Sequence, residues 1–296
     1  MGLRVEFIAF DSMGVRSMAT LVETVDGVFF IDPGAALAPW RYGLPPHEEE
    51  VKALNEALER IYRALSGADY VIITHYHRDH YLYREGEQEH YRGKRLFVKH
   101  PSRYINRSQA VRAYVLFKKR GVESVASEVR YVDASSVELG RVKLEFSQPL
   151  YHGECGTKLG WVLAATIIEE GYTFTFASDV QGCLCDDSLR YILSRSPDFL
   201  VLSGPPTYRG FRELSENTVK LVKELKSGAT LVIDHHLLRD REYAVYLEKL
   251  KSIRGDMLIT TAAEYVGLEV RQLEAYRDLL WGSKKPARAM HEYEEE

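Results

Sequence analysis

The stretch Thr74-His75-Tyr76-His77-Arg78-Asp79-His80 places three imidazoles and one carboxylate within six consecutive positions. It directly follows Tyr70-Val71-Ile72-Ile73, a short apolar run that is typical of a buried strand. The chain has ten histidines in 296 residues, so a polar turn that gathers three of them by chance is a poor explanation. Burying a histidine is also costly unless the ring has a partner. We therefore interpret the stretch as one part of a site for two metal ions.

The composition is that of a globular protein with a substantial core. Hydrophobic residues make up 45% of the chain, which is long enough to bury many of them. The formal net charge is only −4, so the chain as a whole does not resemble a polyanion-binding protein. Any anion-binding role must therefore be local.

The sequence predicts a cytoplasmic protein that does not enter a membrane. The N-terminus passes directly into a strand-like segment, without the basic region, long apolar run and cleavage site of a secretion signal. Charges or turn residues interrupt every apolar stretch before it reaches the roughly 18 residues needed to cross a bilayer. Abundant Glu, Lys, Arg and Tyr beside only three Asn resemble the composition of a thermophile's protein.

Three cysteines, Cys155, Cys183 and Cys185, fit a reducing compartment better than a disulfide framework. We interpret them as small buried residues near the metal site. A disulfide of the kind found in thermophiles, or a soft metal ligand, is the alternative.

Periodic patterns predict an α/β protein. Strands are expected at 5–9, 19–23, 28–31, 70–73, 96–98, 142–146, 160–168, 172–177, 199–202, 230–233 and 257–260. Helices are expected at about 46–65, 108–119, 188–194, 215–226, 241–253 and 270–281. Strand and helix alternate in the C-terminal half, which implies a sheet covered by helices. We expect one domain over 1–282, with a basic insertion at about 81–130, and a disordered tail over 283–296.

Further candidate ligands lie at or just after the ends of other predicted strands. They are His152, Asp179 and the doublet His235-His236. Loops held on a rigid sheet are a usual place for catalytic groups. Imidazole and carboxylate suit Zn²⁺, and also Fe or Mn, whereas a structural zinc site more often has Cys ligands. These residue types therefore predict an open, catalytic site for two divalent ions, with zinc favoured.

The order His75-x-His77-x-Asp79-His80, then His152, Asp179 and His235, resembles the metallo-β-lactamase superfamily. The turn Asp32-Pro33-Gly34 is similar to the early aspartate turn of that superfamily, so the resemblance spans about residues 5 to 260. It implies an αββα sandwich of two mixed β-sheets packed face to face, with helices on the outer faces and the metals at one edge. The chain is most similar to an archaeal branch of the superfamily, for which the resemblance supplies a fold and a site but no substrate.

Carried over position by position, the resemblance also implies a ligand set. One ion would be held by His75, His77 and His152, the second by Asp79, His80 and His235, with Asp179 bridging both and Asp32 supporting the ligands from behind. A hydroxide between the ions would be the nucleophile, with Asp79 and Asp179 as the catalytic carboxylates. His235 is preferred to His236 because it comes first after the strand, and His236 is the alternative.

The doublet His235-His236 also suggests a second protein family. Asp234-His235-His236 matches the short signature of the DHH phosphoesterases. We do not find the further aspartate motifs and glycine-rich segment of that family, so the metallo-β-lactamase interpretation is preferred.

A basic segment bears on the substrate. Residues 92–120 carry ten Lys or Arg and no Asp or Glu, interleaved with aromatic residues. They could form a basic surface near the metals that binds a phosphoester or nucleic acid. The alternative is a solvated face whose charge is balanced in space by acidic residues elsewhere. We therefore favour a hydrolase acting on a small-molecule phosphoester or nucleic acid. Lactone or thioester hydrolysis is one alternative, and a non-hydrolytic metal-binding member of the superfamily is another.

Overall fold

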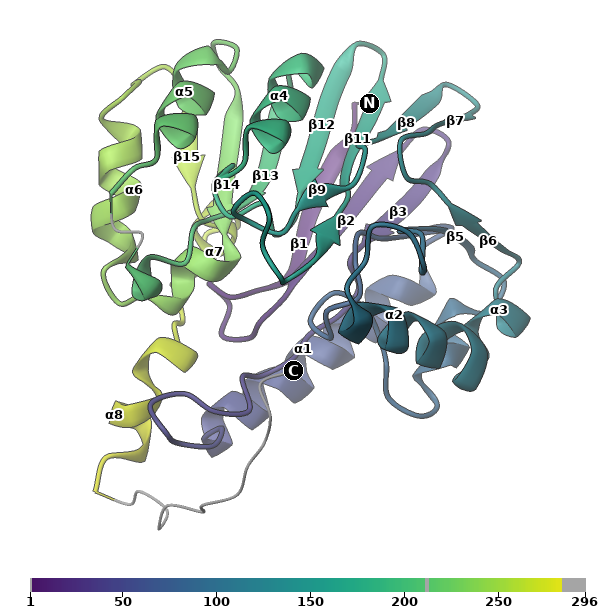
Figure 1. Ribbon diagram of the computed structural model, residues 1–296, viewed down its shortest axis with the longest axis horizontal. Helices are drawn as coiled ribbons and strands as arrows, with labels where there is room; N and C mark the ends of the chain where they lie inside the picture. Colours follow the sequence, from purple (N-terminus) through teal and green to yellow (C-terminus); the bar gives the residue numbers. More distant parts are fainter. Residues whose placement is uncertain (1, 211–212, 284–296) are drawn as a thin grey trace.

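The computed structural model describes residues 2–210 and 213–283, and within them two β-sheets pack face to face (Figure 1). The first sheet has the strand order β1-β2-β3-β4-β5-β6 and the second has the order β15-β14-β13-β12-β11-β8-β7. The strands of the first sheet are β1 (Arg4–Phe10), β2 (Met18–Thr24), β3 (Gly27–Ile31), β4 (Tyr70–Ile73), β5 (Arg95–Val98) and β6 (Glu128–Tyr131). Those of the second are β7 (Ser136–Leu139), β8 (Val142–Phe146), β11 (Ala164–Glu169), β12 (Tyr172–Ala177), β13 (Phe199–Ser203), β14 (Thr230–Asp234) and β15 (Leu258–Thr260). A separate short pair is formed by β9 (Leu150–Tyr151) and β10 (Trp161–Val162).

Each sheet changes from antiparallel to parallel pairing partway across. Strands β1 to β3 pair antiparallel, whereas β3 to β6 pair parallel. In the second sheet, β12 to β15 pair parallel. Parallel neighbours end at the same edge of a sheet, so the loops after β3 and β4 lie together, as do the loops after β12, β13 and β14.

Aromatic and aliphatic side chains fill the space between the two sheets. Phe29 and Phe97 from the first sheet lie in one buried cluster with Phe174 and Phe176 from the second. Fully burying such a side chain contributes about 1.5–3 kcal/mol. This shared core fixes the two sheets relative to each other, and with them the strand ends that carry the site.

Helices cover both outer faces (Figure 1). Buried residues of α1 (Glu48–Ser66), α2 (Arg107–Tyr114) and α3 (Val122–Val125) pack on the first sheet. Those of α4 (Asp186–Arg195), α5 (Glu216–Glu224) and α6 (Tyr243–Lys251) pack on the second. The remaining helices are α7 (Ala262–Tyr265) and α8 (Arg277–Trp281), with shorter turns η1 (Glu87–Tyr91), η2 (Val115–Lys119), η3 (Thr207–Arg209), η4 (His235–Arg239) and η5 (Glu274–Tyr276).

The predicted αββα sandwich is therefore confirmed. The segment 81–130, expected as a basic insertion, contributes β5 and β6 to the first sheet and α2 and α3 to its cover. The tail expected to be disordered lies outside the described residues from 284 onward. Among the described residues, no helix combines the length and the apolar character needed to cross a bilayer.

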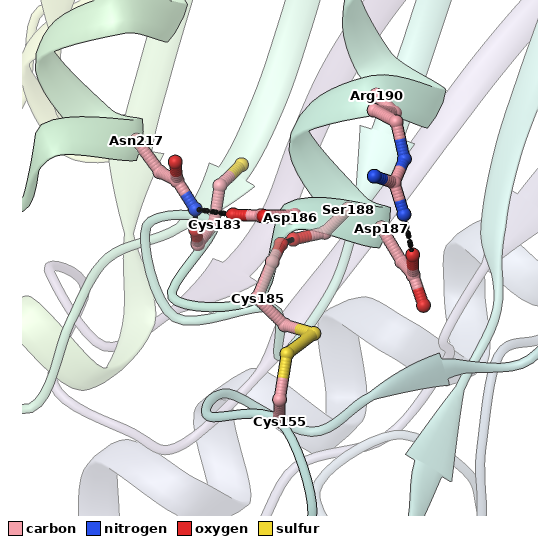
Figure 2. The surroundings of a disulfide bond; sticks show 8 residues. All are labelled: Cys155, Cys183, Cys185, Asp186, Asp187, Ser188, Arg190 and Asn217. Atoms are coloured by element: carbon pink, nitrogen blue, oxygen red, sulfur yellow. Dashed lines mark hydrogen bonds and ion pairs between the residues drawn. A yellow bond between two sulfur atoms is a disulfide. The ribbon is translucent and has the colours of Figure 1, made fainter.

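The cysteine interpretation needs correction. Cys155 and Cys185 form a disulfide across 30 residues of sequence, and Cys183 alone is a free buried thiol (Figure 2). Cys155 is exposed, not buried. The disulfide forms because the loop after β9 and the loop before α4 meet in the folded chain, a proximity that no local pattern encodes.

Candidate metal centre

Asp32 contacts Thr74 and His80, the two ends of the segment that carries the first candidate ligands. It follows β3, which pairs parallel with β4, so it lies beside Thr74 at the end of β4. Its carboxylate accepts hydrogen bonds from the backbone N–H of Thr74 at 2.8 Å and from the Thr74 hydroxyl at 2.6 Å. The same carboxylate lies 2.9 Å from Nδ1 of His80. This contact fixes the ring and leaves Nε2 of His80 to face the site.

The turn after Asp32 comes unusually close to the ligand segment. A Cβ at Gly34 would lie 2.1 Å from the backbone nitrogen of Tyr81 and 2.6 Å from the carbonyl carbon of His80. Backbone cannot yield to such a contact, so only glycine fits here. The Asp-Pro-Gly turn and the histidine segment are thus packed backbone to backbone.

Three histidines form a first group of donor atoms. Nε2 of His75 and Nδ1 of His77 lie 3.1 Å apart, and a ring nitrogen of His152 lies within 4.8 Å of both. His152 follows β9, and the side-chain amide of Gln181 lies 3.3 Å from its Nδ1. The resemblance assigns these three histidines to one ion.

Asp179 lies between this group and a second one. It follows β12, is 1% exposed, and has a left-handed backbone with φ 53°. One carboxylate oxygen lies 3.0 Å from Nε2 of His152 and the other lies 3.0 Å from Nε2 of His80. Asp179 therefore contacts histidines of both groups, as a bridging ligand would.

The second group consists of Asp79, His80 and His235, whose donor atoms also lie within 4.8 Å of one another. Nε2 of His235 lies 3.6 Å from Oδ2 of Asp79 and 3.5 Å from Oδ1 of Asp179. Nε2 of His80 lies 3.7 Å from Oδ1 of Asp79. These residues come from the ends of β4, β12 and β14 and meet because both sheets present those ends at the same edge.

Both histidines of the doublet reach Asp179. Nε2 of His236 lies 3.2 Å from Oδ1 of Asp179, closer than Nε2 of His235. Nδ1 of His236, however, is buried and has no hydrogen-bond partner among the described residues. Nδ1 of His235 lies 2.7 Å from a carboxylate oxygen of Asp11. Metal-ligating histidines usually donate their other N–H to such an acceptor, which favours His235.

Asp11 and Arg239 lie beside the candidate ligands, although no sequence pattern singles them out: Asp11 directly follows β1 and Arg239 ends η4. The carboxylate of Asp11 contacts His235 and accepts a 2.7 Å hydrogen bond from Nε of Arg239. Nη2 of Arg239 lies 3.1 Å from Nε2 of His235 and 3.6 Å from Oδ2 of Asp79. A buried guanidinium thus lies beside the second group, where it can contact an anion.

Protonation states in the first group suit metal binding, whereas both histidines of the second group must lose a proton to ligate an ion. Burial, reinforced by the charge of His80, holds the pKa of His75 well below its usual value, and burial also lowers the pKa of His77 to about 3. Both rings are therefore neutral at pH 7, the form that ligates metals.

In the second group, burial alone would lower the pKa values of His80 and His235, but Asp179 raises that of His80 well above its usual value and Asp11 raises that of His235 to about 9. Burial alone would raise the pKa of Asp179, but His80 and the other surrounding histidines lower it well below its usual range. Asp179 is therefore an anion.

The buried donor atoms fit divalent ions. Nε2 of His80 and Nε2 of His152 are buried and form no hydrogen bond within the described part of the chain, although each lies 3.0 Å from Asp179. Leaving such an atom unsatisfied costs about 1–3 kcal/mol, so a further partner is expected. Nitrogen and carboxylate donors match zinc, iron or manganese.

Comparison with known proteins identifies relatives over nearly the whole length. The model of the Metallo-beta-lactamase superfamily matches residues 13–154. UPF0282 protein MK0213 of Methanopyrus kandleri is 44% identical, covering 95% of this chain and 100% of its own length. A UPF0282 protein of Aeropyrum pernix is 42% identical, covering 94% of this chain and 98% of its own length.

Solved structures share the fold. The metallo-beta-lactamase fold protein YhfI from Bacillus subtilis superposes with a TM-score of 0.56 at 16% identity, covering 88% of this chain and 97% of that one. Tm1679, described as a metal-dependent hydrolase of the β-lactamase superfamily, superposes with a TM-score of 0.52 at 14% identity over the same shares. The fold agrees with the relationship seen in sequence. The chain therefore belongs to the UPF0282 family, within the metallo-β-lactamase superfamily.

Proposed function

We propose that this protein is a hydrolase that uses two divalent metal ions, with zinc favoured. His75, His77 and His152 would hold one ion, Asp79, His80 and His235 would hold the other, and Asp179 would bridge them. The observation that carries this proposal is the position of Asp179, whose two oxygens each lie 3.0 Å from Nε2 of a histidine in a different group. Two such ions, when bound, lower the pKa of water to about 7 and polarise the bond to be cleaved.

The chain's own contribution is to hold the donors rigidly. Asp32 and Asp11 each fix one histidine through its Nδ1, at 2.9 Å for His80 and 2.7 Å for His235. These contacts set which ring nitrogen faces the site. The donors are therefore preorganised, and little rearrangement has to accompany binding or reaction.

Two guanidinium groups support an anionic substrate. Arg112 of α2 donates to the Tyr76 carbonyl at 3.3 Å, beside His77 of the first group. Nη2 of Arg239 lies 3.6 Å from Asp79 of the second group. Arginine is well suited to bind phosphate oxygens through two parallel hydrogen bonds. A phosphoester, which carries its charge on the group under attack, is the substrate class we propose.

The basic segment supports a small phosphoester better than a nucleic acid. Half of its ten cations form ion pairs with acidic residues nearby, namely Arg92 with Glu89, Arg95 with Glu128, Lys99 with Asp133, Lys118 with Glu123, and Arg120 with Glu85. Such pairing reduces the charge available to a phosphate backbone. Nucleic acid remains the second candidate because Arg103 and Arg107 are exposed cations of the same segment.

The test is a substrate panel on the metal-loaded protein, comparing bis-p-nitrophenyl phosphate with a lactone and a thioester. We expect turnover of the phosphodiester. Arg112→Gln should raise KM for the phosphodiester about tenfold, because it removes a charge-assisted hydrogen bond that contributes roughly 1.5 kcal/mol. KM for the lactone and the thioester should not change. Lys119→Gln, an exposed cation on η2, is the matched control. Turnover of the lactone or thioester alone would overturn the phosphoester proposal, and two bound ions without any turnover would indicate a non-hydrolytic member.

Neutralising Lys118, Lys119 and Arg120 together separates the two phosphate candidates. Turnover of the small phosphodiester should be unchanged, because two of these cations are already paired with Glu123 and Glu85. A large loss of activity on single-stranded RNA or DNA, with a steep dependence on salt, would instead favour nucleic acid.

A further inference from the structure

The disulfide joins the outer ends of two segments whose inner ends are candidate ligands. Cys155 lies three residues after His152, and Cys185 lies six residues after Asp179. Inside the molecule, His152 and Asp179 are in contact at 3.0 Å. The two segments therefore meet twice, once at the metal centre and once at the disulfide.

The segment from Asp179 to Cys185 has an unfavourable backbone. Asp179, Gln181 and Cys183 have left-handed φ angles of 53°, 51° and 62°. Non-glycine residues keep such angles only where their surroundings hold them. Hydrogen bonds to Ser203 hold the backbone of Gln181 and Gly182. Beyond them, the Asn217 amide holds the Cys183 carbonyl at 3.0 Å (Figure 2), and the disulfide closes the segment at its end.

The partner segment, residues 153–159, is held mainly at its two ends. Gly153 packs on Gln181 so closely that a Cβ there would lie 2.3 Å from the Gln181 side-chain oxygen. At the other end, the Asn106 amide donates to the carbonyls of Lys158 and Leu159 at 3.1 and 2.9 Å. Between these ends the segment is largely exposed. In this exposed part, the disulfide of Cys155 links the segment covalently to Cys185.

We propose that the Cys155–Cys185 disulfide positions two ligands of the metal centre. This inference rests on the function proposed for that centre. The disulfide holds the segment after His152 against the segment after Asp179 and so fixes the separation of the two ligands. Reducing it lets the Asp179–Cys185 backbone relax away from its left-handed conformation. Affinity then falls for the ion that His152 and Asp179 share, while the ion held by Asp79, His80 and His235 keeps most of its ligands.

The disulfide is accessible to a chemical reductant. Cys155 is exposed, whereas Cys185 is 2% exposed and occupies the N-cap position of α4. A phosphine attacks the Cys155 sulfur and displaces the Cys185 thiolate, which the helix N-terminus favours. Water then hydrolyses the thiophosphonium, giving phosphine oxide and two thiols, so the two electrons come from phosphorus and the protons come from water.

The experiment measures the two metal affinities in three forms of the full chain. These are the oxidised wild type, the phosphine-reduced wild type after removal of the reductant, and the Cys155→Ser/Cys185→Ser double variant. Zn²⁺ is titrated against a chromophoric chelator, and Co²⁺ spectra report the ligand geometry. One affinity should fall about tenfold or more in the reduced and double-variant forms, the range seen when ligand support is lost, while the other falls less, because that ion keeps Asp79, His80 and His235. Cys183→Ala should match the oxidised wild type, and phosphine should not affect the double variant.

The outcomes separate the two proposals. Equal affinities in all three forms, with both ions bound, would overturn the positioning role and leave the metal site intact. A drop in melting temperature with unchanged affinities would do the same, because it would mark the disulfide as purely structural. Failure of every form to bind an ion would overturn the proposed function itself, and the positioning role with it.

Discussion

Asp11 lies 2.7 Å from Nδ1 of His235, although 224 residues separate them in the chain. The carboxylate orients the ring and leaves Nε2 facing Asp79 and Asp179. Asp11→Asn should therefore lower the affinity for one metal ion about 10- to 100-fold, the usual effect of losing a carboxylate behind a ligating histidine. Competition with a chelator measures this, and Asp69→Asn, remote from the site, is the matched control. An unchanged affinity would show that Asp11 does not support a ligand.

The two histidines of the doublet should differ in their effect on metal content. His235→Ala should remove one ion, because His235 has the Asp11 support typical of a ligand. His236→Ala should retain both ions, since Nδ1 of His236 has no such support among the described residues. Metal analysis of the two purified variants distinguishes them. The reverse pattern would assign the ligand role to His236.

Gly34→Ala should disrupt the site without touching any ligand. The new Cβ would overlap the backbone at His80 and Tyr81, so the ligand segment would have to move. We expect lower metal content together with a loss of stability of about 1–3 kcal/mol, the usual cost of overpacking a close contact. Metal analysis and urea unfolding check the two effects. Gly255→Ala, at a position that also lacks a left-handed backbone and has no atom near its Cβ, controls for the loss of glycine itself. Normal metal content in Gly34→Ala would show that the turn does not fix the ligand segment.

The ion pair between Arg16 and Glu274 should make stability depend on pH. Arg16 donates to both carboxylate oxygens at 2.6 and 2.7 Å. Burial alone would raise the pKa of Glu274, but Arg16 outweighs burial and lowers it below the ordinary 4.5. The folded state thus favours the ionised form, so this stabilisation is present above pH 4.5 and is lost as the pH falls through the folded pKa.

Glu274→Gln should therefore be less stable than the wild type at neutral pH, by about 2 kcal/mol. The difference should shrink in acid. Urea unfolding from neutral to acidic pH measures it, with Glu248→Gln, part of an exposed pair with Lys251, as the control of little expected effect. A difference that stays constant with pH would contradict the lowered pKa.

Much of the fold could be predicted from periodicity. The expected strand at 70–73 coincides with β4, and the expected helix at about 46–65 is α1, which ends at Ser66 with Gly67 as its C-cap. Strands β6 and β7 were not predicted, because each is only four residues long and partly exposed, with little apolar signal. The expected helix at 108–119 changes at Val115 into a π-helical turn, a difference in hydrogen bonding that side-chain spacing does not specify.

The candidate site was predictable where ligand types cluster and not where contacts are remote. His75, His77, Asp79 and His80 form a local pattern. Of the later candidate ligands, Asp179 and His235 follow predicted strands, whereas His152 follows β9, a two-residue strand that periodicity does not predict. Asp11 has no local pattern, since its partner His235 lies at the other end of the chain. The same holds for Cys155 and Cys185, whose loops meet only after both sheets have formed.

The metal content of the purified protein tests the central claim most directly. We predict two ions per chain in the wild type, as a shared bridging carboxylate requires, and a clear fall in a His77→Ala/Asp79→Ala double variant. Elemental analysis of both proteins, after equal exposure to zinc, iron and manganese, gives the answer. Fewer than one ion per chain, unchanged in the double variant, would contradict the dinuclear site.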